Sequence, residues 1–446
     1  MRQIREVIFA VAGALLVSML AAVPLAAAGS NGDHTGSIRD GSYAGRPTAQ
    51  GWSGEDGASG DPLMSAAAIR QSAANFHSCI EGLWPLAARK HVSRANFERM
   101  TAQLAPDLRI MDLLDSQPEF TKAVWDYLDV LVNDDRVAAG RALLDKYRST
   151  FDAAEKIYGV DRYVIAAIWG VETNYGEIGG DRPVLRSTAT LACVGRRQHY
   201  FRDEFIAALD ILNRGDVKPN QLIGSWAGAF GPTQFMPTAF QRYAVDFDRD
   251  GRRDVIGSMP DLIASTANNL KKNGWRSGET WGYEVVIPAN FNFDLADRHS
   301  VMTMRDWQRH GITRPGGRPF ARLDDRAFLL VPAGVQGPGF LMLPNFTAIM
   351  RYNPAEAYAL AIGHLADRLR GGGTFAQPWP RYERVLTRDE RLELQQLLER
   401  HGFDVGEPDG RLGAKTRAAL RNFQARIGRV PDGFASAGVL ARLRRR

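Results

Sequence analysis

Cysteine is scarce in this sequence. Cys79 and Cys193 are the only two among 446 residues, and they match no metal-ligand spacing and no redox motif. A cysteine-based metal centre and a dithiol redox site are therefore excluded. The two residues are expected to be buried free thiols. One disulfide between them is the alternative in an oxidising compartment, and the sequence leaves open whether their Cα atoms lie close enough.

Long hydrophobic runs are also absent after residue 30, so no integral membrane span is expected in the mature protein. The N-terminus combines a basic start, MRQIRE, the apolar stretch VIFAVAGALLVSMLAAVPL and the small residues AAAGS. This pattern predicts a secretory signal peptide, cleaved most simply after Ala28. A retained membrane anchor is the alternative. No cysteine follows the apolar run, so a lipid-anchored form is not supported.

The chain is too long for one hydrophobic core, so two or three domains are expected. Apolar residues at three- and four-residue spacing predict a mainly helical protein, while short apolar runs bounded by Gly and Pro predict a β-rich insertion. A Gly-, Ser- and Asp-rich segment predicts a disordered linker. The expected division is a signal peptide at 1–28, this linker at 29–62, a large domain at 63–370 with the β-rich insertion at 281–346, a second linker at 371–383 and a small domain at 384–446.

The small C-terminal domain is basic. From residue 384 onward there are 14 Lys and Arg against 8 Asp and Glu, so its excess equals the formal net charge of +6 of the whole chain. Pro-Asp-Gly occurs at 408–410 and 431–433, each time before a helical stretch. A basic exported domain indicates an acidic polymer as partner. Nucleic acid is a poor candidate outside the cytoplasm, and a solvated helix face without a partner is the alternative.

The stretch AIWGVETNYG, residues 167–176, ends an apolar run with an ionisable acid. A helix that is apolar all round is buried, so Glu172 is expected among core residues. Burial disfavours the charged carboxylate and raises its pKa, which suits a general acid at neutral pH. The alternative is a glutamate that reaches solvent at the end of its helix.

The stretch GSWAGAFGPTQFMP, residues 224–237, combines small, aromatic and polar residues. Small residues let a backbone approach a ligand closely. Aromatic faces stack on sugar rings, while Ser225 and Gln234 offer directional hydrogen bonds. A tightly packed structural loop is the alternative.

The stretch DFDRDGRRD, residues 246–254, places aspartates at positions 1, 3 and 5 of a loop of the EF-hand type and Gly251 at position 6. Position 12 is Gly257 instead of glutamate, so the standard loop fails there, and Asp261 closes the shell if the loop is longer. Carboxylates at alternate positions repel one another without a cation, which favours calcium. A solvated acidic turn is the alternative.

Together these segments resemble the B-type lytic murein transglycosylases. The resemblance covers about residues 65–370 through AIWGVETNYG, CVGRRQHYF, GSWAGAFGPTQFMP, YAVDFDRDGRRD, STANNLKKNGW and MRYNPAEAYALAI. The tail resembles a peptidoglycan-binding module through LQQLLERHGF and PDGRLGAKTRAALRNFQ. The implied fold is mainly α (α+β). It consists of a lysozyme-like helical catalytic domain with a small β-insertion, followed by a three-helix peptidoglycan-binding domain.

The resemblance implies roles for single positions. Glu172 corresponds to the family's single catalytic acid. Positions that match substrate-binding residues are Ser225, Gln234, Phe235, Tyr352, Asn353 and Tyr127, with Arg196 and Arg197 facing the acidic peptide stems. Positions that match the family's calcium loop are Asp246, Asp248, Asp250, the carbonyl of Arg252, and Asp261.

The implied activity is cleavage of the β-1,4 bond between N-acetylmuramic acid and N-acetylglucosamine, with formation of a 1,6-anhydro ring. It needs no cofactor for catalysis, and calcium is expected only as a structural ion. A muramidase that hydrolyses the same bond and a non-catalytic cell-wall binder are the alternatives. The implied partners are peptidoglycan glycan strands, other cell-wall enzymes are a further class, and the implied location is the periplasm.

Overall fold

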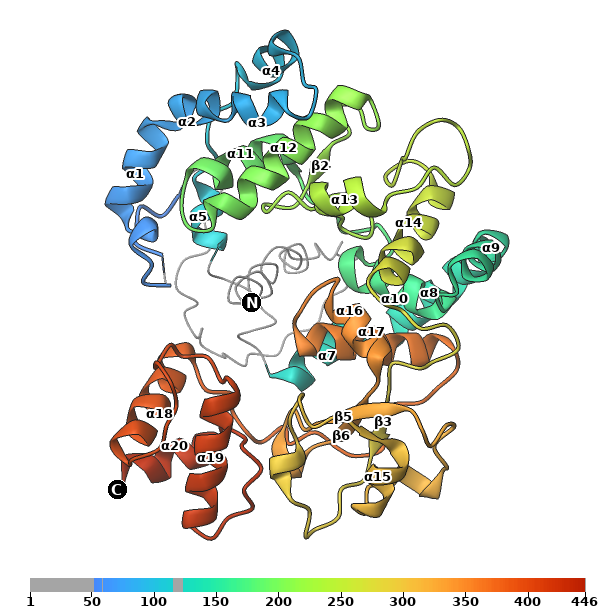
Figure 1. Ribbon diagram of the computed structural model, residues 1–446, viewed down its shortest axis with the longest axis vertical. Coiled ribbons are helices and arrows are strands. Elements are labelled where there is room, and N and C mark those ends of the chain that lie inside the picture. Colours follow the sequence, from blue (N-terminus) through green and yellow to red (C-terminus); the bar gives the residue numbers. More distant parts are fainter. Residues whose placement is uncertain (1–51, 58, 115–122, 446) are drawn as a thin grey trace, which may run out of the picture. The chain divides into compact units, whose positions relative to one another are not determined.

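The computed structural model describes residues 52–57, 59–114 and 123–445 (Figure 1). The predicted signal peptide at 1–28 lies outside these residues. The chain divides into two compact units. The first comprises the described part of Met1–Gln117 together with Gly176–Arg242 and Asp250–Gly257, and the second comprises the described parts of Pro118–Tyr175, Tyr243–Arg249 and Ser258–Arg446.

The first unit is helical. Its two longest helices, α11 and α12, pack against each other, and a hydrophobic core that includes Phe97, Phe201 and Phe205 surrounds them. Helix α12 is followed by Gly215, which takes the left-handed conformation (φ 77°) common one residue past a helix end. The helices of this unit are α1 (Ala66–Ala74), α2 (Phe76–Gly82), α3 (Trp84–Ala88), α4 (Arg94–Thr101), α5 (Arg109–Leu113), α11 (Val184–Cys193), α12 (Gln198–Arg214) and α13 (Pro237–Tyr243), with the short strands β1 (Arg182–Pro183) and β2 (Ile223–Gly224).

The folded part of the first unit begins earlier than predicted. Ser53 donates from its backbone N and from its Oγ to the carboxylate of Asp112, over 3.0 and 2.6 Å. Trp52 packs against the core and lies under the guanidinium of Arg70. The segment has few apolar residues of its own, but these contacts with the core offset the entropy cost of ordering it. The prediction of a disordered linker as far as residue 62 is therefore wrong for residues 52–57 and 59–62.

Cys79 and Cys193 form a disulfide in the first unit, with Cα atoms 6.0 Å apart. The expectation of two free thiols was wrong. Helices α2 and α11, which carry the two cysteines, are packed against each other although 114 residues separate the sulfurs along the chain. Proximity of this kind is set by helix packing, which no local sequence pattern encodes.

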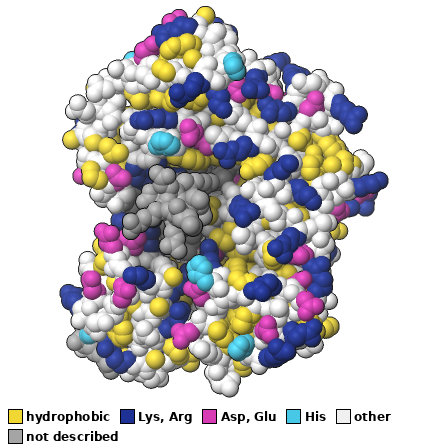
Figure 2. All heavy atoms as spheres, in the orientation of Figure 1, with side chains coloured by type: hydrophobic (Ala, Val, Ile, Leu, Met, Phe, Trp, Pro, Cys, Tyr) yellow, Lys and Arg dark blue, Asp and Glu magenta, His cyan; other side chains and the backbone are white. Residues whose placement is uncertain are grey.

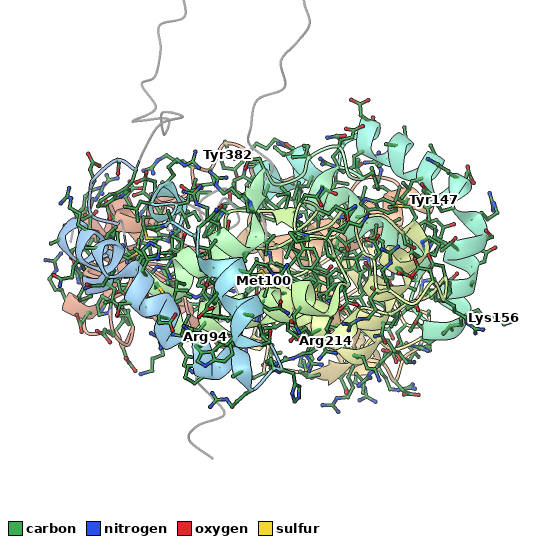
Figure 3. All side chains as sticks on the ribbon, turned by 90° about the horizontal axis from the view of Figure 1, so that it is seen from above. Arg94, Met100, Tyr147, Lys156, Arg214 and Tyr382 are labelled. Carbon is green, nitrogen blue, oxygen red and sulfur yellow. A yellow bond between two sulfur atoms is a disulfide. The ribbon has the colours of Figure 1, made fainter. Side chains whose placement is uncertain are left out.

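The helical part of the second unit is centred on α10. This helix packs against α17 and α8, and α17 in turn contacts α7. Between α8 and α9 the chain turns at Tyr147, and Lys156 points outward from α9 (Figure 3). The helices are α7 (Val124–Leu131), α8 (Asp134–Lys146), α9 (Arg148–Tyr158), α10 (Arg162–Thr173), α14 (Met259–Lys272), α16 (Pro344–Met350) and α17 (Glu356–Leu369).

The predicted β-rich insertion is an antiparallel sheet of the second unit. Its strand order is β3-β6-β5-β4, and the predicted hairpin is β5 with β6, in which Leu329 pairs with Leu341. Both leucines belong to a small core centred on the buried Trp307 of α15. The bounds are β3 (Gly282–Val285), β4 (Met302–Thr303), α15 (Met304–Arg309), β5 (Arg326–Leu330) and β6 (Gly339–Met342).

The described part of the C-terminal module, for which the bounds 384–446 are predicted, has the three expected helices: α18 (Arg388–Arg400), α19 (Ala414–Arg426) and α20 (Ala437–Arg444). The two Pro-Asp-Gly turns are held alike. The side-chain oxygen of Gln395 accepts from the backbone N of Asp409 and Gly410, and that of Gln424 accepts from Gly433 N. In each copy of the sequence repeat, one buried glutamine thus accepts hydrogen bonds from the backbone N–H groups of one Pro-Asp-Gly turn.

Positively and negatively charged side chains alternate on the surface of the described residues. On the face shown in Figure 2, Lys and Arg side chains are interspersed with Asp and Glu. Among the described residues, no helix is long and apolar enough to cross a membrane.

Candidate active site

Glu172 lies in the last turn of α10, in the second unit. Asp161 caps the start of the helix, where its side chain accepts from Tyr163 N over 2.9 Å. Asn174 follows the last helical residue in the left-handed conformation (φ 50°). Every residue from position 164 to 173 is buried, and Glu172 is only 1% exposed. The expectation of a buried carboxylate is confirmed, and the alternative of a glutamate that reaches solvent is wrong.

Tyr358 of α17 donates a hydrogen bond of 2.7 Å from its hydroxyl to Glu172 Oε1. Burial and the adjacent Glu172 raise the pKa of Tyr358 well above its usual value, so the phenol keeps its proton and acts as a donor. Tyr352 and Tyr127 lie close enough to raise this pKa further. Of the candidate residues, Glu172 contacts Tyr358 directly, while Tyr352 and Tyr127 act only on its pKa.

Sequence reasoning missed Tyr358 as a site residue. It stands within MRYNPAEAYALAI, six residues after Tyr352, on a helix whose other interior residues are mostly aliphatic. A lone hydroxyl on such a face was a usable signal, because a buried Tyr O–H usually finds a partner.

Asn353 and Tyr352 precede α17 and are both buried. The side-chain oxygen of Asn353 accepts from Ala355 N over 3.1 Å, which fixes the amide at the start of the helix. Within the part of the chain that the structure describes, Asn353 Nδ2 has no hydrogen-bond partner. A buried amide donor of this kind is a candidate for a ligand contact.

Gly170 interrupts the apolar run of α10 because Tyr175 occupies the space beside it. A Cβ at Gly170 would lie 2.6 Å from Tyr175 Cζ, and a Cβ at Gly140 of α8 would lie 2.1 Å from the same side chain's hydroxyl. Arg136 secures the turn by donating from Nε to Asn174 Oδ1 over 3.0 Å. The end of α10, and with it Glu172, is thus held by close packing and by one buried arginine.

Ser225, Gln234 and Phe235 are buried residues of the first unit. They belong to a tight loop in which Phe230 bridges both Gly224 and Phe235, and Ser225 Oγ accepts from Ala229 N over 3.0 Å. Gln234 has a left-handed backbone (φ 51°), a strained state typical of functional sites. Among the described residues, no hydrogen-bond partner is found for Gln234 Oε1.

The loop is anchored from α12 by a second buried acid. Glu204 accepts from the backbone N and the hydroxyl of Thr238, over 2.9 and 2.7 Å. Burial raises the pKa of Glu204, while both Thr238 hydrogen bonds lower it in part. These hydrogen bonds satisfy both carboxylate oxygens, so Glu204 supports the loop structurally.

Arg196 and Arg197 lie just before α12 in the first unit, and both are partly exposed. Arg196 donates to the carbonyl of Leu114 over 2.9 Å. Arg197 has a left-handed backbone (φ 63°), and its guanidinium lies 5.0 Å from the ring centre of Tyr200. Ordered arginines of this kind can pair with carboxylates.

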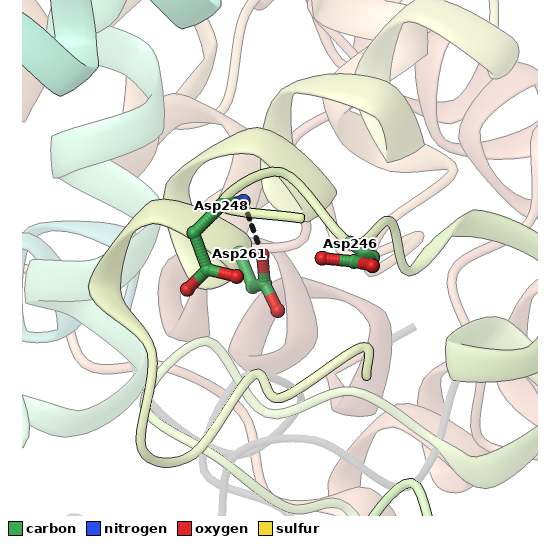
Figure 4. Close-up of side chains that lie close together, drawn as sticks. All are labelled: Asp246, Asp248 and Asp261. Atoms are coloured by element: carbon green, nitrogen blue, oxygen red, sulfur yellow. Dashed lines mark hydrogen bonds between the residues drawn. The ribbon is translucent and has the colours of Figure 1, made fainter. Parts of the chain in front are cut away.

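Asp246, Asp248 and Asp261 form a cluster in the second unit (Figure 4), with one ligand atom of each within 4.8 Å of the others. Asp261 is fully buried at the start of α14, and its Oδ1 accepts from Phe247 N over 2.6 Å. An all-oxygen donor set that includes a buried carboxylate fits a hard cation such as calcium. Asp250 and Arg252 belong to the first unit, where Asp250 accepts from Arg252 N over 2.9 Å.

Residues 75–367 match the family model of the transglycosylase SLT domain, which is more than half of the chain. The chain belongs to this transglycosylase family. Residues 387–443 match the model of the peptidoglycan binding domain. The chain is thus a lytic murein transglycosylase of lysozyme-like fold with a C-terminal peptidoglycan-binding module, as predicted, and this family cleaves glycosidic bonds without water.

Named relatives agree with this assignment. The chain is 30% identical to the membrane-bound lytic murein transglycosylase B of Escherichia coli (strain K12) over 298 residues, 62% of this chain and 80% of that one. It is 43% identical to SltB3 of Pseudomonas aeruginosa, whose crystal structure contains NAG-anhNAM-pentapeptide, with a TM-score of 0.80 over 83% of this chain and 99% of that one. The Escherichia coli transglycosylase Slt35 in complex with calcium has 28% identity and a TM-score of 0.57, over 66% of this chain and 92% of that one.

Proposed function

We propose that Glu172 is the single acid and base with which this transglycosylase cleaves the bond between N-acetylmuramic acid and N-acetylglucosamine. The observation that carries the proposal is the buried Glu172 with the Tyr358 hydroxyl bonded to Oε1. A buried carboxyl group is favoured in its neutral form. Because Oε1 accepts from Tyr358, the transferable proton belongs on Oε2.

The reaction then follows from one carboxyl group. Glu172 donates its proton to the glycosidic oxygen, and the departing sugar carries that proton away. The N-acetyl carbonyl of the muramic acid stabilises the electron-poor C1. The Glu172 carboxylate next takes the proton of the C6 hydroxyl, whose oxygen attacks C1 and closes the 1,6-anhydro ring. Most glycosidases need a second carboxylate, and here the substrate supplies its role.

The other candidate residues bind the glycan and its peptide. Gln234 Oε1 of the first unit and Asn353 Nδ2 of the second unit are buried polar atoms for which the described residues offer no partner. Each is therefore a candidate for a hydrogen bond to the glycan. Ser225 contributes a hydroxyl, and Phe235, Tyr352 and Tyr127 contribute aromatic faces. Arg196 and Arg197 pair with stem carboxylates. The NAG-anhNAM-pentapeptide bound to SltB3 is a ligand with these groups.

Asp246, Asp248 and Asp261 of the second unit would hold a structural calcium ion. The family resemblance adds Asp250 and the carbonyl of Arg252 as further candidate ligands. The convergence of three carboxylates supports this site, and so does the calcium complex of Slt35. Catalysis needs no cofactor in this scheme. The ion would hold the loop after α13 to the start of α14.

The enzyme works in the periplasm, after removal of a signal peptide at 1–28. Its catalytic domain spans 63–370, a linker spans 371–383 and the binding module spans 384–446; the residues matched by the two family models fall within the two domains. Glycan strands are the partner of both domains. The basic excess of the module favours an acidic polymer of this kind.

Mass spectrometry of the muropeptides that purified mature protein releases from sacculi tests the reaction. We expect products lighter than hydrolytic ones by one water and resistant to borohydride, and we expect none from Glu172→Gln. Reducible products would identify a muramidase and overturn the intramolecular step. Full activity of Glu172→Gln would overturn the assignment of the acid. No release by either form would indicate a binder without activity.

A further inference from the structure

The C-terminal module contacts the rest of the second unit through charged side chains. Arg417 of α19 lies 3.7 Å from Glu356, the first residue of α17. Arg298 of the β-rich insertion donates to the same glutamate from Nε and Nη2, over 2.9 and 2.6 Å. Burial alone would raise the pKa of Glu356, but Arg417 and Arg298 outweigh it and lower this pKa. Arg421 of the module also donates to Asp294, over 3.0 Å.

A second set of contacts lies at the end of the module's last Pro-Asp-Gly turn. Phe434 packs against an apolar cluster of Ala123, Trp125 and Ala333, joined by Trp379 of the connecting segment and Val385 of the module. Asp432 Oδ2 accepts from Val335 N over 2.9 Å. Gly334 has no side chain at this point, and a Cβ there would lie 2.8 Å from Phe434 Cβ. The turn is therefore fitted closely to the loop between β5 and β6.

Both sets of contacts lead to helices that carry tyrosines of the candidate site: Tyr358, which bonds Glu172, and Tyr127, which acts on the pKa of Tyr358. Glu356 stands two residues before Tyr358 on α17. Trp125 stands two residues before Tyr127 on α7. The two helices contact each other, and the Tyr358 hydroxyl bonds Glu172. A binding module on a flexible tether would require none of these contacts.

From this arrangement we infer that the peptidoglycan-binding module braces the catalytic centre, with Arg417 and Phe434 as positioning residues for α17 and α7. The inference rests on Glu172 being the catalytic acid. Arg417 and Arg298 hold the start of α17 through Glu356, and Phe434 holds the start of α7 through Trp125. Together they keep Tyr358 and Tyr127 in place beside the acid, so the module contributes to turnover as well as to attachment.

The test is turnover of a short soluble glycan by the full chain, because a short substrate separates bracing from attachment to the polymer. For Arg417→Ala and Phe434→Leu we expect kcat to fall about three- to tenfold, with KM within twofold of the parent. Pelleting with insoluble peptidoglycan should stay unchanged. Arg417→Lys keeps the charge beside Glu356 and should recover most of the loss.

Matched controls lie within the same module. Lys415, also on α19, pairs with Asp404 inside the module. Lys415→Ala therefore removes an ion pair but leaves the contacts of Arg417 and Phe434, here called the brace, unchanged. Phe403 packs in the module's own core, and Phe403→Leu is the counterpart of Phe434→Leu. Both controls should keep the parent kcat. Because Arg417 is 45% exposed, Arg417→Ala is expected to fold, which circular dichroism and the melting temperature check.

The brace is overturned if both brace variants keep the parent kcat, or if they lower kcat no more than the controls do. That outcome would leave the module as an attachment device. It is distinguishable from failure of the proposed acid, since Glu172→Gln is assayed on the same substrate. An active Glu172→Gln would refute the acid, whereas an inactive Glu172→Gln with unimpaired brace variants would refute the brace alone.

Discussion

The Tyr358 hydroxyl lies 2.7 Å from Glu172 Oε1 and donates to it across a sequence separation of 186 residues. Both side chains are fully or almost fully buried. A phenol that keeps its proton gives the carboxyl group one fixed donor and so fixes its orientation. Tyr358 is therefore a positioning residue for the proposed acid.

Tyr358→Phe removes this hydrogen bond and keeps the ring. Glu172 becomes charged as it gives up its proton, and a hydrogen bond to a charged group is worth about 1.5–3 kcal/mol. We therefore expect kcat to fall roughly 10- to 100-fold. KM should change little, because the variant acts on the acid and not on the sugar subsites. The matched control is Tyr382→Phe in the exposed linker (Figure 3). Equal kcat values for Tyr358→Phe and the parent would contradict the positioning role.

Calcium removal should destabilise the second unit. A ligand that binds only the native state stabilises it by about 2.7 kcal/mol at a concentration 100 times its Kd. Chelation should therefore lower the melting temperature, and added calcium should restore it. The shift should vanish in Asp261→Asn, which alters a buried residue of the proposed site, and persist in Asp404→Asn in the exposed part of the C-terminal module. A chelator shift that Asp261→Asn retains would place the ion elsewhere.

Reduction of the Cys79–Cys193 disulfide should destabilise the first unit. The bond joins cysteines 114 residues apart, and closing a loop of this length restricts the unfolded chain by about 4–5 kcal/mol. We expect the oxidised protein to melt at a higher temperature than the reduced one. The control is Cys79→Ala/Cys193→Ala, whose melting temperature a reductant should not change. An unchanged melting temperature of the parent on full reduction would show that the bond adds no stability.

Acidification should act on α17 through two buried groups of opposite effect. Burial, aided by the charge of Arg368, lowers the pKa of His364 to about 4. Below about pH 6.5 the His364 imidazole of the unfolded chain binds a proton, whereas that of the native protein stays neutral down to about pH 4. This difference lowers the stability of the native protein as the pH falls from about 6.5 to about 4. Burial raises the pKa of Asp367 to about 6. The native protein then gains a proton that the unfolded chain lacks, so stability rises between pH 6 and 4.

In the parent protein the contributions of His364 and Asp367 to the pH dependence of stability offset each other. Single variants separate them. His364→Phe keeps a ring against Phe375 and should gain up to about 3 kcal/mol relative to the parent between pH 6.5 and 4. Asp367→Asn should show the opposite, a steeper loss on acidification. Urea unfolding at several pH values measures both. Stability curves that run parallel for parent and variants would contradict the assignment.

Local patterns determined the elements and the chemistry of single stretches. The all-apolar run of α10 predicted a buried helix, and Glu172 at its end is buried because a helix without a polar face has no side to turn to water. Short apolar runs bounded by Gly and Pro predicted β3, β5 and β6, because turn residues end a strand locally. Alternating hydrophobicity and turn residues act within a few positions, and a sequence displays them directly.

Only the tertiary structure decided which distant residues meet. Tyr358 reaches Glu172 because α17 packs on α10, and Cys79 reaches Cys193 because α2 packs on α11. The order of residues 52–57 likewise depends on Asp112, some sixty positions away. The sequence by itself determined a buried acid on a helix, an aspartate loop and a basic three-helix module. Their partners depended on packing between elements, which is the sum of many weak contacts and leaves no mark at any single position.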